Sequence, residues 1–409
     1  MIRSFVISAL ALVLLSACEP ADQATHQAVP AGAIDTSHLR PPIPPPIGLR
    51  RETPITQQTL TDSTVKIALL LPITGRHADL GRAMRDAAIV SQFDKYATLS
   101  PEANKHRVEL VTYDTGDTPE QAREAAIKAV DDEVVLLIGP VFADATQAVA
   151  PVAEAAGLSV ISFSNNLAVA RPNIYLFGFS PEQQTKRVID FAATQGRNQL
   201  AAFVPNSAYG QAVLATARST IVNNGGTLVA DAVYSPQGVG IESSIDKIVP
   251  KGKAAAFDSV FLPEGGVPLA TILRELRNRG VHGESVKLLG TGLWDDPTLL
   301  SRFNLDGAWF ATSPPQFTQA FETRFQNTYQ YQPSRVASLS YDAVALAITI
   351  VTSGRSFVPS VLTSSGGFHG PANGIFRFRK DGTSERGLAV LQVRGGSFEV
   401  VSPAPASFR

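Results

Sequence analysis

The chain has 409 residues, of which 44% are hydrophobic and 17% charged, and its 35 basic and 36 acidic side chains give a net charge of −1. This length predicts two or three domains with a sizeable core, and the composition excludes a mainly disordered chain. The balanced charge, with no long basic stripe, disfavours nucleic-acid binding, which needs many Lys and Arg side chains on one face.

The N-terminus has the pattern of a secretory signal. A positive charge at Arg3 precedes an apolar run over residues 5–17, which is too short to span a bilayer. Cys18, the one cysteine of the chain, follows directly. The tetrad Leu-Ser-Ala-Cys that it ends resembles the lipobox of bacterial lipoproteins. We therefore predict a signal peptide at residues 1–17 and an acylated Cys18 that anchors the protein to a membrane. The alternative is a plain signal peptide with a chance cysteine.

Lipoproteins of this pattern with Glu19, and not Asp, after the cysteine pass to the outer membrane of Gram-negative bacteria. The resemblance thus implies a periplasmic protein anchored to that membrane. We expect a Cys18→Ser variant to leave the membrane fraction on cell fractionation, since serine cannot carry the thioether-linked lipid. A variant that still sediments with membranes would place the anchor elsewhere.

Residues 18–64 have no hydrophobic periodicity, and they contain the proline-rich stretch 41–46. Proline favours polyproline II, so we predict a semi-rigid spacer between the lipidated N-terminus and the folded body. A recognition site for a proline-binding partner is the alternative interpretation.

From residue 65 onward, short apolar runs alternate with segments of helical spacing. The first series of expected strands is 65–71, 108–113, 134–138 and 159–163, and the second is 200–204, 227–233, 259–262 and 287–289. Such runs are typical of strands that are buried on both faces of a parallel sheet. Two such series predict an α/β protein with two doubly wound lobes.

Local signals refine this prediction. Thr118 and Ser180 are each followed by Pro-Glu-Gln, a pattern that predicts a capped helix start with proline in the first turn. Near the C-terminus, runs at 375–378, 388–393 and 398–401, with Gly-Gly before the last, predict a hairpin.

Specific residues then resemble the leucine/isoleucine/valine-binding family of type I periplasmic binding proteins. The similarity covers residues 65–401, and its main motifs are Leu-Pro-Ile-Thr-Gly at 71–75, Gly-Pro-Val-Phe at 139–142 and Val-Ile-Ser at 160–162. The resemblance implies two lobes that close on a ligand. We assign residues 65–179 and 311–370 to the first lobe, and residues 180–310 and 371–402 to the second.

Three chain crossings between the lobes are expected near residues 177–180, 306–310 and 369–373. We expect hinge glycines at or beside these crossings, at Gly178, Gly307, Gly370 and Gly374.

The same resemblance implies which loops meet the ligand, because ligands of open α/β sheets bind beyond the carboxyl ends of the strands. The candidate ligand-binding residues are Leu80, Phe142, Ala143, Asp144, Ser164, Asn165, Asn166, Tyr209, Glu264 and Trp294. At the positions where amino-acid receptors of the family hold the ligand ammonium with acids, this chain has Ser180 and Gly292. An unpaired buried ammonium is costly, so this change disfavours a free α-amino acid.

The lipid anchor, the long tether and the altered site together resemble the penicillin-binding protein activator lipoproteins, in the C-terminal half of that family. This resemblance implies a non-enzymatic regulator of cell-wall synthesis whose partner is a peptidoglycan synthase. The alternative is the solute-binding receptor of an ABC importer, with an amino acid, an amide or a related small polar ligand.

No pattern in the sequence favours catalysis or a bound metal. The histidines are scattered without metal-ligand spacing, at positions 26, 38, 77, 106, 282 and 369. Neither a nucleophile elbow nor a phosphate-binding loop occurs. We therefore expect no catalytic residue, no metal and no cofactor.

Overall fold

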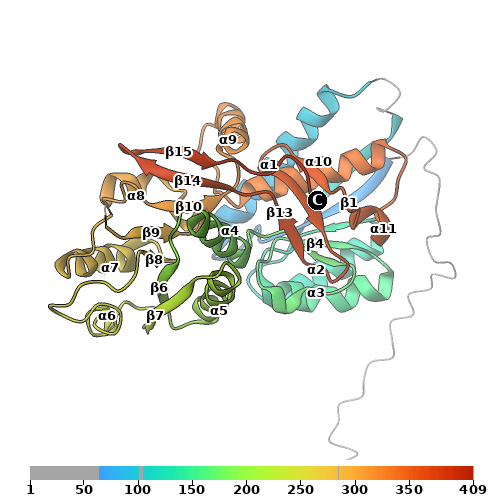
Figure 1. Ribbon diagram of the computed structural model, residues 1–409. Helices are drawn as coiled ribbons and strands as arrows, with labels where there is room; N and C mark the ends of the chain where they lie inside the picture. The colour runs from blue at the N-terminus through green and yellow to red at the C-terminus, as the bar shows by residue number, and fades with distance from the viewer. Residues whose placement is uncertain (1–63, 101–104, 284, 409) are drawn as a thin grey trace, which may run out of the picture. The chain divides into compact units, whose positions relative to one another are not determined.

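The computed structural model describes residues 64–408, except 101–104 and 284 (Figure 1). The predicted signal peptide, Cys18 and the proline-rich tether lie outside the described residues. Among the helices that are described, none is both long and apolar enough to cross a membrane.

The first sheet has five parallel strands in the order β2-β1-β3-β4-β5. The strands are β1 (Thr64–Leu71), β2 (Arg107–Asp114), β3 (Leu137–Ile138), β4 (Val160–Ser162) and β5 (Ile174–Leu176). The first four confirm the strands predicted in this part of the chain. The edge strand β5 was not predicted.

Helices cover both faces of this sheet, as alternate residues of β1 show. Ile67 and Leu69 pack in a core with α1 (Ala78–Ala97) and α10 (Ala337–Thr352), whereas Ala68 and Leu70 pack with the helices of the opposite face. The other helices of this lobe are α2 (Pro119–Asp131), α3 (Ala143–Ala156), α9 (Pro315–Tyr329), α11 (Pro359–Leu362) and the short η2 (Leu167–Val169). The near-continuous apolar run of β1 follows from burial on both faces.

The second sheet has seven strands in the order β15-β14-β10-β9-β8-β6-β7. Its parallel strands are β6 (Gln199–Pro205), β7 (Thr227–Tyr234), β8 (Ser259–Phe261), β9 (Lys287–Gly290) and β10 (Trp309–Thr312), and the antiparallel strands β14 (Ala389–Arg394) and β15 (Ser397–Ser402) extend one edge. Four of the five parallel strands were predicted, and β10 was not.

Alternate residues again face opposite layers. Leu200 and Ala202 of β6 pack in one core cluster, and Ala201 and Phe203 pack in the other. The helices of this lobe are α4 (Pro181–Thr194), α5 (Ala208–Asn223), α6 (Ile241–Ile245), α7 (Gly266–Asn278), α8 (Pro297–Arg302) and the short η3 (Gly292–Trp294). The expected class, α/β with two doubly wound lobes, is confirmed.

The predicted local signals are present. Thr118 Oγ1 accepts from the Gln121 backbone N–H at 3.3 Å, and the Gln121 side chain accepts from the Thr118 N–H, which completes the capping box. The predicted hairpin is β14 with β15. Gly395 and Gly396 form its turn, with φ values of 57° and 77° that favour glycine.

Ser180 also caps its helix, but Gln183 does not complete a capping box. The Gln183 side chain instead bridges to the strand β13 (Ser384–Arg386), where it donates to the Ser384 carbonyl and accepts from the Arg386 N–H. The start of α4 is thereby tied to a segment about 200 residues later in the chain.

A small antiparallel sheet of β11 (Phe368–Gly370), β12 (Gly374–Phe378) and β13 packs with the first lobe. Phe376 and Phe378 lie in the same core cluster as α1 and α10, whereas the sequence analysis placed residues 371–402 in the second lobe. We propose that the lobes divide at residues 387–388, so that the second lobe resumes with β14.

The crossings between the lobes differ from expectation in two of three cases. The first lies at residues 177–180, as predicted, between β5 and α4. The second lies at residues 313–314 and not at 306–310, because β10 is an inner strand of the second sheet. The third follows β13, since residues 369–373 belong to the small sheet and its first turn. Gly307, Gly370 and Gly374 are therefore not hinge residues at crossings.

Candidate functional site

Seven candidate ligand-binding residues lie at one edge of the first sheet, on three loops or in the first helical turn that follows them. The loops follow β1, β3 and β4, which are neighbours in the sheet, and the seven residues are Leu80 in α1, Ala143 and Asp144 in α3, and the loop residues Phe142, Ser164, Asn165 and Asn166. The His77 and Phe142 rings are in contact, with centroids 4.6 Å apart, so the loops after β1 and β3 touch. The fold thus places these residues at one edge of the first sheet, and their contact with a ligand stays a prediction.

The loop after β1 has a fixed shape. Asp114, at the end of β2, accepts hydrogen bonds from the backbone N–H groups of Ile73 and Thr74, and from the Thr74 hydroxyl at 2.6 Å. These hydrogen bonds hold the pKa of Asp114 below its usual value, against the opposing effect of desolvation. Gly75 approaches Asp117 too closely to admit a Cβ and has a φ of 82°, so glycine is needed there.

The loop after β3 leads into α3, whose N-terminus faces this edge. Phe142 is its N-cap residue and provides no side-chain cap, so the first turn of α3 keeps free backbone N–H groups. Asp144 is exposed, and its carboxylate accepts from the Ala145 N–H. The free N–H groups favour an anionic partner.

The loop after β4 is polar and partly exposed. Ser164 is buried and its hydroxyl accepts from the Asn166 N–H at 3.2 Å, whereas the side chains of Asn165 and Asn166 are exposed. Asn166 caps η2 by accepting from the Ala168 N–H. Asn165 is therefore the residue of this loop best exposed for a ligand.

The three candidates of the second lobe also lie at one sheet edge, beyond β6, β8 and β9: Tyr209 in the first turn of α5, Glu264 on a loop and Trp294 in η3. The Trp294 indole N–H donates to the Glu264 carbonyl at 2.8 Å, and the Glu264 carboxylate accepts from the Tyr234 hydroxyl and the Gly265 N–H. Trp294 is wholly buried, so it supports Glu264 from behind and does not face a ligand.

Tyr209 has the most unusual environment of the ten candidates. Its hydroxyl is buried and makes no hydrogen bond of normal geometry, but the Thr291 side chain lies close enough to lower its pKa. Burial, together with the charges of Glu264 and Glu182, outweighs this contact and raises the pKa of Tyr209 to about 12. The side chain is therefore a neutral hydroxyl, on which two carboxylate charges act and whose nearest partner is Thr291.

Glu182, which sequence reasoning missed, supplies negative charge next to an altered position. Ser180 donates a 2.7 Å hydrogen bond to the Glu182 carboxylate, so an acid lies beside the position where the family resemblance expected one. Gly292, the other altered position, contacts the Arg335 guanidinium, which a side chain at this position would displace. The Pro-Glu-Gln pattern after Ser180 was the available signal for Glu182, but it was interpreted only as a helix start.

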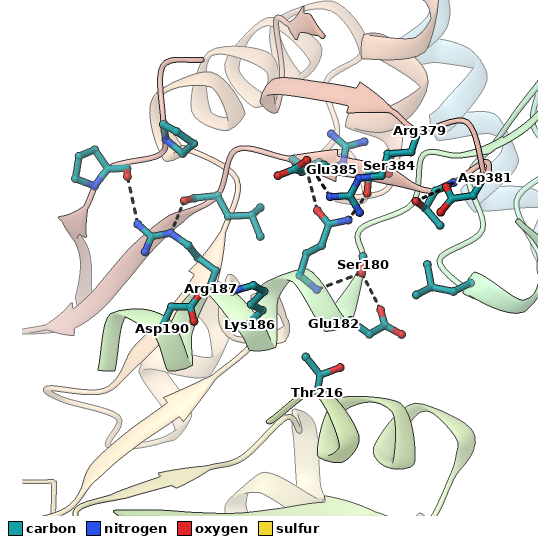
Figure 2. Close-up of a pocket in the computed structure, with 17 residues that line it drawn as sticks. Ser180, Glu182, Lys186, Arg187, Asp190, Thr216, Arg379, Asp381, Ser384 and Glu385 are labelled. Atoms are coloured by element: carbon teal, nitrogen blue, oxygen red, sulfur yellow. Dashed lines mark hydrogen bonds and ion pairs between the residues drawn. The ribbon is translucent and has the colours of Figure 1, made fainter. Parts of the chain in front are cut away.

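A cavity of about 720 Å³ opens beside Ser180 and Glu182 (Figure 2). Ser180, Glu182 and Lys186 of its lining come from the first crossing and α4, and Leu167 comes from the first lobe. Its cations and anions are partly paired with one another, as in Lys186–Asp190 at 2.6 Å and Arg379–Glu385 at 3.0 Å. None of the ten candidates lines this cavity. Its charges favour a polar solute over a strongly charged one.

Within the described part of the chain, no group of three or more His, Cys, Asp or Glu residues is placed to hold a metal ion.

Two buried donors of Arg386, Nε and Nη1, lack a partner, while its Nη2 donates to the Phe177 carbonyl at 2.6 Å. Phe177 lies at the start of the first crossing and Arg386 directly precedes the third. The hydrogen bond between them therefore links the starts of these two crossings.

The chain was compared with known proteins. Residues 64–397 match the family model described as periplasmic binding protein. A leucine-, isoleucine-, valine-, threonine- and alanine-binding protein of Pseudomonas aeruginosa is 24% identical over 241 residues, which cover 57% of this chain and 62% of that protein. The matched region thus spans only 62% of the length of that protein, and only 51% of the length of a second curated relative, an uncharacterized protein of Rickettsia prowazekii.

Solved structures of the same fold cover most of the chain. A putative branched-chain amino acid ABC transporter protein from Rhodospirillum rubrum has a TM-score of 0.73 and 21% identity, covering 83% of this chain and 99% of its own. A branched-chain amino acid substrate-binding protein from Streptococcus pneumoniae, in complex with isoleucine, has a TM-score of 0.59 and 20% identity, covering 83% of this chain and 100% of its own. The family match over residues 64–397 and the two doubly wound lobes agree, and the chain belongs to the periplasmic binding protein family.

Proposed function

We propose that the protein is the solute-binding receptor of an ABC importer in the periplasm, and that its ligand is an amino acid, an amide or a related small polar molecule. The observation that carries this proposal is the pair of complementary chemistries at the two sheet edges. The first lobe offers backbone N–H groups at the start of α3, and the second offers the Tyr209 hydroxyl, on which the charges of two carboxylates act.

The first-lobe edge suits a carboxylate. A helix N-terminus with free N–H groups favours negative charge, and α3, with 14 residues, is long enough for this effect. The exposed amide of Asn165 can add a hydrogen bond from the neighbouring loop. These groups support a ligand that has an acidic end.

The second-lobe edge suits a hydrogen-bond donor or an ammonium group. Glu182 and Glu264 both act on Tyr209, and each carboxylate retains acceptor capacity beyond its internal hydrogen bonds. In the sequence analysis, Ser180 and Gly292 at the positions of two acids disfavoured an amino acid as the ligand. Glu182 and Glu264 supply negative charge that offsets this loss. The names of the relatives, which include amino-acid binding proteins, support the same class.

The regulator of cell-wall synthesis receives no support from the relatives described above, and the resemblance to penicillin-binding protein activators stays a prediction. Its partner, a peptidoglycan synthase, and the lipid anchor at Cys18 are likewise untested predictions. A receptor with these edges needs no catalytic group, and we propose none.

Binding to the full chain can be measured by calorimetry against a panel of amino acids, their amides and small carboxylic acids. With the ligand found, we expect Tyr209→Phe and Glu264→Gln each to weaken binding about tenfold or more, because each removes a hydrogen-bonding group from the edge. Tyr113→Phe is the matched control, since the Tyr113 hydroxyl bonds to Asp132 away from these loops.

Two results would contradict the proposal. In one, no member of the panel binds, while a peptidoglycan synthase domain binds with measurable affinity. In the other, a ligand binds, and the two edge variants bind it as tightly as the wild type does.

A further inference from the structure

Arg335 joins the two lobes across the crossings. It lies between α9 and α10, and its carbonyl accepts from the N–H and the hydroxyl of Ser338, at 3.3 and 2.7 Å, so its backbone is fixed to the first lobe. Its guanidinium contacts the second lobe instead, where Nη1 donates to the Gly292 carbonyl at 2.7 Å and Nη2 donates to Thr312 Oγ1 at 2.8 Å.

A carboxylate and an aromatic ring complete the surroundings of the guanidinium. Nε lies 3.7 Å from Asp295 Oδ2, and this carboxylate also accepts from the Thr312 hydroxyl at 2.7 Å. The guanidinium carbon lies 4.3 Å from the centroid of the Phe179 ring, in the first crossing. Only 25% of the Arg335 side chain is exposed. Hydrogen bonds from a partly buried cation are stronger than neutral ones.

Gly292 is shaped for this contact. Its N–H donates to the Gln184 side chain at 2.9 Å, which holds the backbone of the residue whose carbonyl accepts from Arg335. A Cβ at residue 292 would lie 2.6 Å from Arg335 Nη1 and 2.7 Å from Nη2. Any other residue at this position would therefore push the guanidinium away from its acceptors.

We propose that Arg335 is a positioning residue that holds the two lobes together in the absence of ligand, through its contacts with Gly292, Thr312 and Asp295. We call these contacts the Arg335 bridge. In a receptor without such a bridge, fewer protein contacts oppose the separation of the lobes when no ligand is bound. Here the Arg335 bridge adds such contacts, so a ligand meets lobes that are already held together.

The proposal does not depend on the identity of the ligand, and it is tested without one. Cysteines at the exposed positions Glu124 in α2 and Gln211 in α5, in a Cys18→Ser background, allow spin labels to report the distance between the lobes. In the full chain, we expect the wild-type distribution to be dominated by one short distance. Arg335→Ala should raise the population at longer distances about tenfold or more, because it removes two charged hydrogen bonds.

Further variants separate the bridge from a general loss of stability. Arg335→Lys keeps the charge but cannot make both hydrogen bonds in the same geometry, so an intermediate distribution is expected. Arg324→Ala is the matched control, since Arg324 forms its ion pair with Asp94 inside the first lobe at 2.8 Å. It should leave the distribution unchanged.

Gly292→Ala tests the bridge from the second lobe. It should open the lobes as Arg335→Ala does, whereas Gly366→Ala, at a glycine with no atom within 4 Å of its added Cβ, should not. The proposal is overturned if Arg335→Ala and Gly292→Ala both remain folded and keep the wild-type distance distribution. It is also overturned if the wild type already populates the long distances as much as Arg335→Ala does.

Discussion

Replacing Trp294 by alanine is expected to destabilise the protein by about 3–5 kcal/mol, the usual cost of removing a large buried aromatic side chain. Trp294 is 0% exposed and belongs to the main core cluster of the second lobe. Its ring lies against Gly290, where an added Cβ would be 2.3 Å from a ring carbon. The variant also leaves the Glu264 carbonyl without the indole N–H that it accepts from.

Denaturant unfolding measures this loss as a fall in the midpoint. Trp294→Phe should lose much less, because it keeps an aromatic ring and gives up mainly the hydrogen bond. The neighbouring Leu293 is 48% exposed, so Leu293→Ala is the matched control and should stay within about 0.5 kcal/mol of the wild type. An unchanged midpoint for Trp294→Ala would mean that the ring is not packed as the structure shows.

Asp342→Asn is expected to destabilise the protein, and to do so more strongly at low pH than at neutral pH. Asp342 is wholly buried in α10, where its carboxylate accepts from the Ala372 N–H at 2.7 Å and from the Asn373 side chain at 2.8 Å. It also balances the buried charge of Arg386. An asparagine offers one acceptor in place of two, so about 2 kcal/mol is lost at pH 7.

The pH dependence follows from the pKa of Asp342, which burial raises to about 6, against the opposing hydrogen bonds. In the unfolded chain this pKa is about 3.9, so between these values the folded state binds more protons than the unfolded state. The contribution of Asp342 to stability therefore rises as the pH falls through this window. From pH 7 to pH 4.5, the penalty of Asp342→Asn should grow by about 2 kcal/mol.

Urea unfolding of wild type and variant at several pH values gives this difference directly. Asp381→Asn is the control without a pH effect in this window. Hydrogen bonds from Thr383 hold the pKa of Asp381 below its usual value, so the penalty of that variant should stay nearly constant between pH 7 and pH 4.5 and shrink only below about pH 4. A penalty for Asp342→Asn that is constant between pH 4.5 and 7 would contradict the raised pKa.

Local sequence patterns determined the fold class and most of its elements. The buried strands, the Thr118 capping box and the Gly395–Gly396 hairpin depend on contacts between residues close in sequence, and these contacts leave a periodic or motif signal. The placement of the candidate residues at two sheet edges also followed, because each lies in the loop after a predicted strand or in the helical turn that follows it. Strands β5 and β10 were missed, although strands as short as β4 and β8 were predicted.

Tertiary structure alone decided how the site is assembled and which residues support it. Arg335 is 43 residues from Gly292, and Arg386 is 209 residues from Phe177. No local pattern encodes such pairs, because their partners are chosen by the packing of whole lobes. The same holds for Trp294, which the sequence placed at the ligand and the structure buries behind Glu264. A residue's position after a strand fixes the edge where it lies, but neighbours from distant segments decide whether its side chain faces the solvent or the core.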